Sequence, residues 1–303
     1  MGNWDYLAES TGRLAAEIGY TCRIKIYPDG FTATAASRAV FRRAGWESDS
    51  PRRSGSRRDD IPDEVRAKDN AERSRRRAAA AMRDLALSND WKYFVTFTLD
   101  RRKIDRYDAK VVTRKLNQWL DNRVRRKGLR YLIVPELHKD GALHYHGLVN
   151  DCLPVEDSGT ISRPGDKKPR KPRSKKQRAE WIAAGGHVVY NMPDWSLGFS
   201  TAIELYGDRM AAINYVAKYI TKADSKCAGR WYYHSNNLAL PHVLYSDYDI
   251  DSLEADAAAY LLETGVAPDV IPQQLGRKYS QVEAINLTLF THSQFLEGDN
   301  ENG

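Results

Sequence analysis

The pattern of apolar and polar positions is most regular between residues 93 and 222. Runs of β-branched and aromatic residues, each of strand length, predict four strands in this stretch, at 93–99, 129–138, 142–149 and 198–206. Apolar residues spaced three and four apart predict a helix over 108–127, which stops at Gly128, and another from Asp208 to about Lys222. Helices that are few and unevenly placed between hairpin strands favour an α+β fold on an antiparallel sheet.

The two ends of the chain have a different pattern. Residues 21–27 alternate like a strand and are followed by a turn signal, Pro28-Asp29-Gly30, and by FTATA. An Arg-rich linker then leads to a helix expected over about 71–87, and two C-terminal helices are expected over 252–263 and 280–295. We therefore divide the chain into an N-terminal accessory region (1–90), a central domain (91–245) and a C-terminal helical region (246–303).

The charge of the chain is concentrated in one segment. The formal net charge is +7, yet residues 163–178 contain nine Lys or Arg and one Asp. Three prolines are expected to keep this segment extended, within a basic insertion that spans about 152–186. One interpretation is a solvated linker; the other is a DNA-phosphate contact made by Lys167, Lys168, Arg170, Lys171, Arg173, Lys175, Lys176 and Arg178.

Several classes of protein are disfavoured by composition. No apolar run approaches the roughly 20 residues that a membrane span needs. The first residues have neither a basic leader nor an apolar core, so a secretory signal is not indicated. Three scattered cysteines (Cys22, Cys152 and Cys227) disfavour a disulfide framework and a structural zinc knuckle. We expect a cytoplasmic protein without a membrane partner.

A cluster of potential metal ligands lies in the hairpin expected over 129–149. His144 and His146 are two positions apart on a strand, so their imidazoles share a face. A three-residue loop with Gly141 at a positive-φ position would place Glu136 directly opposite His144, and His138 beside the cluster. A two-residue loop would place Glu136 on the other face. We favour the first arrangement, which offers two nitrogens and one carboxylate to Mg²⁺ or Mn²⁺, although zinc would also bind.

An unusual tyrosine pair lies on the helix that ends near Lys222. Ile213, Val216, Ala217 and Ile220 form one stripe, which is the natural core face, while Tyr215, Lys218, Tyr219 and Lys222 form the opposite stripe. Tyrosines at helical spacing usually pack in a core, but here aliphatic residues already supply the packing face. The lysines suit a phosphate-facing surface that favours the phenolate, and the two tyrosines suit successive nucleophiles. A metal site and such a pair together indicate phosphoryl transfer.

Three segments, taken in this order, resemble the HUH endonucleases, particularly the two-tyrosine replication initiators of rolling-circle phages and plasmids. FVTFTLD (94–100) is similar to their first motif, and ELHKDGALHYHGL (136–148) to their His-hydrophobic-His motif with Glu136 as the third ligand. NYVAKYITK (214–222) is similar to their tyrosine motif, and WSLGFS (195–200) is typical of phage-type initiators. The resemblance covers about 93–222.

The resemblance implies a central antiparallel sheet of about five strands flanked by helices, with extensions at both ends. It implies a site-specific nickase-ligase that cuts single-stranded DNA at an origin, forms a 5′-phosphotyrosine link, leaves a free 3′-hydroxyl primer and later rejoins the strands. It also implies a host polymerase and helicase in a bacterial cytoplasm as partners. No Walker A sequence is present, so a fused helicase of the eukaryotic-virus type is not expected. Tyrosines that follow the histidine motif separate this pattern from conjugative relaxases.

Other functions fit parts of the same pattern. A two-tyrosine transposase would use the same motifs on transposon ends. A non-catalytic DNA-binding protein would hold a structural metal on its histidines and would tolerate loss of either tyrosine. A metal-dependent enzyme acting on RNA is a weaker alternative. The origin sequence, the first nucleophile, the catalytic lysine and the oligomeric state stay open at this level.

Overall fold

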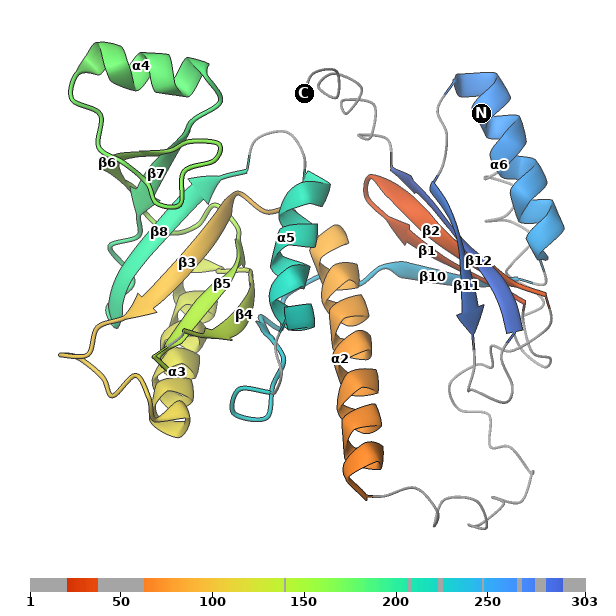
Figure 1. The fold of residues 1–303 in the computed structure, drawn as a ribbon, viewed down its shortest axis with the longest axis horizontal. Helices are drawn as coiled ribbons and strands as arrows, with labels where there is room; N and C mark the ends of the chain where they lie inside the picture. Colours follow the sequence, from red (N-terminus) through yellow and green to blue (C-terminus); the bar gives the residue numbers. More distant parts are fainter. Residues whose placement is uncertain are drawn as a thin grey trace. The chain divides into compact units, whose positions relative to one another are not determined.

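The strand-forming runs in the middle of the chain assemble into one antiparallel sheet (Figure 1). The computed structural model describes residues 21–37, 63–138, 140–205, 209–222, 226–246, 248–265, 269–275 and 282–290. The fold is α+β, as predicted, with antiparallel sheets and five helices among the described residues. The chain forms two units, one from Asp60 to Leu240 and the other from the segments before and after it. Each unit is described by itself.

The unit of residues 60–240 has a seven-stranded sheet in the order β6-β7-β8-β3-β5-β4-β9, with every neighbouring pair antiparallel. Its strands are β3 (Tyr93–Leu99), β4 (Tyr131–Leu137), β5 (Leu143–Val149), β6 (Glu156–Ser162), β7 (His187–Asn191), β8 (Gly198–Glu204) and β9 (Tyr233–His234). The four predicted strands are therefore confirmed as β3, β4, β5 and β8. The resemblance implied about five strands; β6, from the basic insertion, and the short β9 lengthen the sheet.

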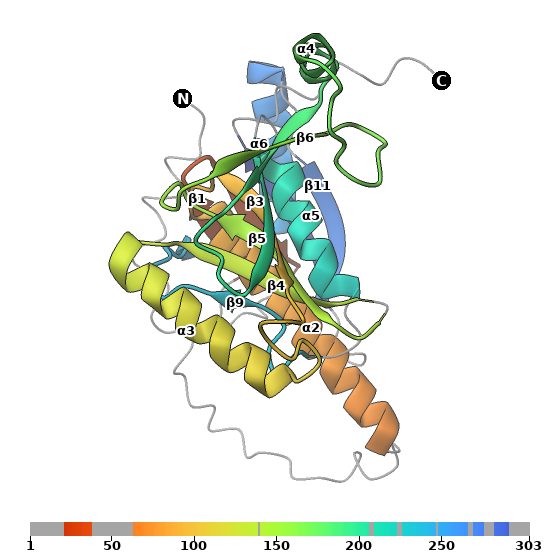
Figure 2. The ribbon, with the colours of Figure 1, turned by 90° about the vertical axis from the view of Figure 1, so that its left-hand side faces the viewer.

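Helices cover both faces of this sheet (Figure 2). α3 (Ala109–Lys127) lies on one face and is capped by the Asp108 side chain, which accepts hydrogen bonds from two backbone amides, and by Gly128 at φ 68°. α5 (Arg209–Lys222) contacts β4 and β5 on the other face and packs against α2 (Asp63–Leu87). The predicted helix over 108–127 is thus confirmed, and that over 71–87 begins earlier, at Asp63.

The main core of this unit lies between the sheet and α3. Alternate residues of β3 and β5 enter it, among them Val95, Phe97 and Tyr145, each no more than 1% exposed. Trp195 stacks on Phe97 at a ring distance of 4.5 Å and meets the edge of Trp119 at 5.0 Å. The intervening residues of each strand must then face the opposite side, where α5 lies.

The basic insertion is more ordered than its prolines suggested. β6 pairs with β7, and α4 (Lys175–Ala183) begins after Ser174, which caps it. The prediction of an extended segment up to residue 178 is therefore wrong for its last part. Pro172 is the last of the three prolines, and the residues beyond it carry no proline to prevent a helix. Arg163 packs over the Trp181 ring at 4.3 Å, which ties α4 to the end of β6.

The second unit is a five-stranded antiparallel sheet in the order β10-β1-β2-β12-β11, with one described helix. Its elements are β1 (Cys22–Tyr27), β2 (Gly30–Ala36), β10 (His242–Ser246), α6 (Ile250–Thr264), β11 (Asp269–Leu275) and β12 (Val282–Phe290). Leu253 and Ala257 of α6 pack with Cys22, Ile24 and the inward residues of β2 and β12. The strand at 21–27 and the helix at 252–263 are confirmed.

The helix expected over 280–295 is wrong, because residues 282–290 form strand β12. Helical spacing had selected Val282, Ile285 and Leu289 but skipped Leu287. Ile285, Leu287 and Leu289 are all buried, at every second position, which is the period of a strand with one face in a core. Pairing with both β2 and β11 decides between the two patterns.

The expected domain boundaries also differ from the units. β1 pairs with β10 and β2 with β12, so the described N-terminal strands join the C-terminal part instead of forming an accessory region. α2 belongs to the unit of residues 60–240. Trp231 donates from Nε1 to Ser74 Oγ at 3.1 Å, and Asn89 exchanges hydrogen bonds with the backbone of Ala239. The boundaries differ because strands from distant segments pair, and the order of residues along the chain does not show which strands pair.

None of the helices in the described residues is both long and apolar enough to span a membrane.

Candidate active site

The hairpin of β4 and β5 has the register that the three-residue loop predicts. Glu136 pairs directly with His144, and His146 pairs with Val134. Gly141 has φ 82°, and its amide donates to the carbonyl of His138, while the His138 amide donates to that of Ala142. Glu136, His144 and His146 consequently share one sheet face, as predicted, and Tyr145 enters the core behind them.

Two threonines of β3 orient the histidines. Thr96 Oγ1 lies 3.0 Å from His146 Nδ1, and Thr98 Oγ1 lies 3.4 Å from His144 Nδ1. Each threonine contacts the histidine directly opposite it, because Thr96 pairs with His146 and Thr98 with His144 across the two strands. The Nδ1 atoms are thereby engaged, so Nε2 is the atom of each ring that would meet a metal, and that of His146 contacts Glu136 in this structure. Sequence reasoning missed these two threonines, although the alternation of FVTFTL on a strand beside the histidine strand contained the signal.

The carboxylate and the histidines contact one another. Glu136 Oε2 lies 2.7 Å from His146 Nε2, and the His138 ring stacks on His144 with centroids 5.1 Å apart. His138 is thus beside the cluster, as predicted, and its Nδ1 also approaches Asp140 at 3.3 Å. Burial lowers the pKa of both His144 and His146, which favours neutral imidazoles. Neutral rings are the form that binds metal.

The two tyrosines of α5 lie against this face. The Tyr219 ring stacks on His146 with centroids 4.3 Å apart and an interplanar angle of 10°. The Tyr219 hydroxyl donates to the Tyr215 hydroxyl at 2.9 Å, and Tyr215 meets the edge of Phe94 at 5.3 Å. Tyr215 is 49% exposed. Burial, followed by the hydrogen bond to Tyr215, raises the pKa of Tyr219. Both tyrosines therefore belong to the same site as the histidines.

The remaining faces of α5 follow the predicted division. Ile213, Val216 and Ile220 are fully buried, and Ala217 is partly buried. Lys218 is exposed on the tyrosine stripe. Lys222 is the last residue of α5, and its side chain lies outside the described residues, as does Asp208, the expected cap. An apolar inner stripe anchors the helix so that its outer stripe carries the tyrosines.

The donor set fits a divalent ion, although the present geometry does not enclose one. Among the residues that the structure describes, no three His, Cys, Asp or Glu side chains are arranged around a common point. The Glu136 carboxylate instead meets His146 directly, and its side chain is 45% exposed, so the carboxylate has room to move. Two oriented imidazoles and one carboxylate on the same face are the ligand types that suit Mg²⁺, Mn²⁺ or zinc.

The candidate DNA-binding residues of the insertion are mostly exposed. Lys167, Lys168, Arg170, Lys171, Arg173, Lys175 and Lys176 are all exposed, whereas Arg178 is partly buried. Arg178 donates to Asp157 at 2.6 Å, and Arg170 lies 3.6 Å from Asp166. These two arginines are therefore partly engaged by acidic residues of the insertion, and the others remain on its surface.

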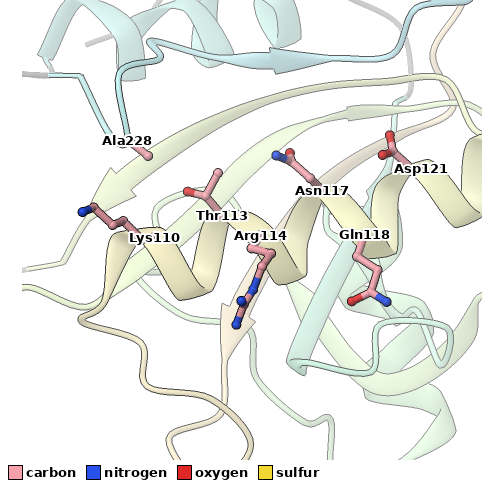
Figure 3. Close-up of a pocket in the computed structure, with 7 residues that line it drawn as sticks. All are labelled: Lys110, Thr113, Arg114, Asn117, Gln118, Asp121 and Ala228. Atoms are coloured by element: carbon pink, nitrogen blue, oxygen red, sulfur yellow. The ribbon is translucent and has the colours of Figure 1, made fainter.

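A separate hollow lies along α3 (Figure 3), lined by Lys110, Thr113, Arg114, Asn117, Gln118, Asp121 and Ala228. Lys110, Thr113, Asn117 and Asp121 lie along the side of α3 nearer Ala228, and Arg114 and Gln118 extend from its other side. The hollow contains no histidine or tyrosine, and α3 covers the opposite sheet face from Glu136. We therefore assign the candidate chemistry to the α5 face.

Comparison with known proteins identified a matching family model. Residues 92–224 match the model of a family described as Replication-associated protein ORF2/G2P. No curated protein and no solved structure matched the chain. The matched segment begins just before β3 and ends just after α5, so it contains every histidine, threonine and tyrosine of the site above. The family match supports a replication initiator of the Rep type, a function that has DNA as its partner.

Proposed function

We propose that the chain is a two-tyrosine HUH endonuclease that initiates rolling-circle replication by nicking single-stranded DNA at an origin. The observation that carries the proposal is the stacking of Tyr219 on His146 at 4.3 Å, beside Glu136 and His144. A nucleophilic hydroxyl and a candidate metal site are then within reach of one phosphodiester. The family match to residues 92–224 supports the replication context.

The proposed reaction is a strand transfer. A tyrosine hydroxyl loses its proton, its oxygen bonds to phosphorus, and the bond from phosphorus to the 3′ oxygen breaks. The 3′ oxygen takes up a proton and leaves as a hydroxyl, while the 5′ phosphate stays on the tyrosine. No water is consumed, so attack by a 3′-hydroxyl reverses the step and rejoins the strands. A second tyrosine, one helical turn away, allows a second transfer.

The residues around the tyrosines have distinct tasks. Glu136, His144 and His146 would hold Mg²⁺ or Mn²⁺, which when bound supplies positive charge to the phosphate oxygens. Thr96 and Thr98 orient the two rings. The ammonium of Lys218 or Lys222, on the same stripe of α5, would stabilise the phenolate. This help is needed because burial and the bond to Tyr215 raise the pKa of Tyr219.

The basic insertion would bind the phosphates of the origin duplex or of the displaced strand, which adds affinity without sequence readout. Synthesis from the 3′-hydroxyl would require a polymerase and a helicase of a bacterial host. A cytoplasmic location follows from this proposed role.

An end-labelled single-stranded DNA assay with Mn²⁺ tests the proposal, with fragments that scan the intergenic region of the source replicon. The wild type should form a protein–DNA adduct that survives SDS and is lost in EDTA. The adduct should also be absent from the Tyr215→Phe/Tyr219→Phe double variant and from the His144→Ala/His146→Ala variant. Arg114→Gln, on the exposed side of α3, is the control and should form as much adduct as the wild type.

Binding without an adduct on any fragment would contradict the enzyme and favour a non-catalytic DNA-binding protein. An adduct that forms on transposon ends instead of a replicon origin would favour a transposase with the same chemistry.

A further inference from the structure

A second feature of the tyrosine-bearing face lies at the far end of β3. A pocket there is lined by Thr98, Leu99, Asp100, Arg101, Arg102, Arg106 and Phe199. Thr98 is the residue that orients His144, so the pocket adjoins the candidate site. Three arginines against one aspartate give the pocket a positive charge, which suits a phosphate.

Phe199 occupies the same cross-strand row as the candidate ligands. It pairs with Thr98, which pairs with His144, which in turn pairs with Glu136. Residues paired across strands point to the same face, and neighbouring strands are about 4.8 Å apart. Phe199 therefore lies roughly 10 Å from His144 on that face, two strand spacings away.

The exposure of Phe199 has no structural explanation within its own unit. Its side chain is 62% exposed, whereas Phe97 of the neighbouring strand β3, which faces the core, is 1% exposed. Gly198 precedes it and cannot be replaced freely, because a Cβ there would lie 2.1 Å from the Thr98 carbonyl oxygen. The close approach of the two strands holds Phe199 in place. An exposed, fixed aromatic ring is a suitable platform for a nucleobase.

The arginines of the pocket differ in their availability. Arg102 makes a bidentate contact to Asp100, with Nη2 to Oδ2 at 2.9 Å, and this contact lowers the pKa of Asp100 to about 2. Arg106 donates to Asp140 at 2.8 Å in the turn of the histidine hairpin. Arg101 is exposed, and no acidic residue in the described part of the chain pairs with it. Its guanidinium is the cation that is free for a phosphate.

The segment that carries these arginines is anchored. The Asp100 amide donates to the Leu197 carbonyl at 3.0 Å, and Lys103 Nζ donates to the Ser196 carbonyl at 3.1 Å. The carbonyl of Arg106 accepts from the Leu143 amide at 3.2 Å. Ile104 is buried beneath it. The pocket is thus preformed, which reduces the entropy lost on binding.

From these observations we infer that the pocket holds a nucleotide of the single strand next to the scissile phosphate, with its base on Phe199 and its phosphate on Arg101. The inference rests on the proposed function for the identity of the strand. It adds two residues, Phe199 and Arg101, that bind DNA without taking part in the covalent step.

Binding of fluorescein-labelled (dT)₂₀ to the full chain tests the inference, in the Tyr215→Phe/Tyr219→Phe background with Mn²⁺ so that no covalent bond forms. Phe199→Leu should weaken binding about tenfold, as loss of one base–aromatic stack does, and Phe199→Trp should retain it. Arg101→Gln should weaken binding and reduce the slope of log K against log salt by about 0.7, the value for one phosphate on a single strand. Phe199→Leu should leave this slope unchanged.

Arg114→Gln is the matched control, because it removes the same charge from an exposed residue of α3 on the other side of the sheet. Circular dichroism melting of each variant shows whether it is folded. Wild-type affinity in Phe199→Leu, or an equal loss in Arg114→Gln and Arg101→Gln, would overturn the inference.

Failure of this inference and failure of the proposed function give different results. If Phe199→Leu weakens binding but the wild type forms no adduct on any DNA, the pocket stands and the nicking reaction fails. If the wild type forms the adduct but neither variant alters binding, the pocket alone is refuted.

Discussion

The two faces of the seven-stranded sheet are built from the same strands but have opposite roles. On β5, Leu143 and Tyr145 are at most 1% exposed under α3, while His144 and His146 lie on the face of α5. On β3, Phe97 joins the aromatic core and its neighbours Thr96 and Thr98 contact the histidines. The difference shows that a rigid apolar face supports the precise placement of polar groups on the other.

The largest expected effect separates the two tyrosines. Tyr219→Phe should reduce single-turnover adduct formation by on the order of 10⁶-fold, because removal of a catalytic nucleophile costs about this much and Tyr219 is the one stacked on His146. Tyr215→Phe should reduce it much less. The measurement is the rate of SDS-stable adduct formation on a single-stranded origin fragment. A reversed order would make the exposed Tyr215 the first nucleophile.

A second prediction contrasts stability with activity across the sheet. Trp195→Ala should lower the free energy of unfolding by about 3–5 kcal/mol, because it removes the ring that packs on both Phe97 and Trp119. His144→Ala should lower it by less than about 1.5 kcal/mol yet abolish metal-dependent nicking. Guanidinium unfolding followed by far-UV circular dichroism measures both. Equal losses of stability would mean that His144 has a structural role instead.

A third prediction concerns the glycine that follows His146. A Cβ on Gly147 would lie 2.2 Å from the Leu132 carbonyl oxygen and 2.6 Å from Ile133 Cγ2, so the strands must separate in Gly147→Ala. We expect a loss of about 1–3 kcal/mol in the free energy of unfolding, together with weaker metal binding. Gly128→Ala is the control: nothing lies within 4 Å of its Cβ, and only its φ of 68° opposes the change. A Gly147→Ala protein as stable as the wild type would contradict this.

The smallest effect is expected from a substitution at Tyr145, the residue between His144 and His146. The Tyr145 hydroxyl is buried without a hydrogen-bond partner among the described residues. Tyr145→Phe removes an unpaired polar group and should raise the free energy of unfolding by up to about 1 kcal/mol. Its nicking rate should equal that of the wild type, in contrast to both neighbouring histidine variants. Lower stability in Tyr145→Phe would reveal a partner for the hydroxyl.

Much of the candidate site was predictable because its signals are local. The period of a strand placed His144 and His146 on one face, and Gly141 indicated the loop that brings Glu136 opposite. Helical spacing separated Tyr215 and Tyr219 from the buried stripe of α5. The threonines of β3 and Phe199 were less accessible, since their relevance depends on which strands pair with β3.

Local periodicity by itself determined that this chain has an α+β central unit, a strand with two histidines on one face, and a helix with two outward tyrosines, while the turn signal only favoured Glu136 on the histidine face. Only the tertiary structure decided that Tyr219 stacks on His146, that residues 282–290 form a strand, and that segments from both ends share one sheet. The physical reason is the range of the forces involved. Side-chain direction follows from the neighbouring residues, whereas strand partners and ring contacts depend on burial between segments far apart in the chain.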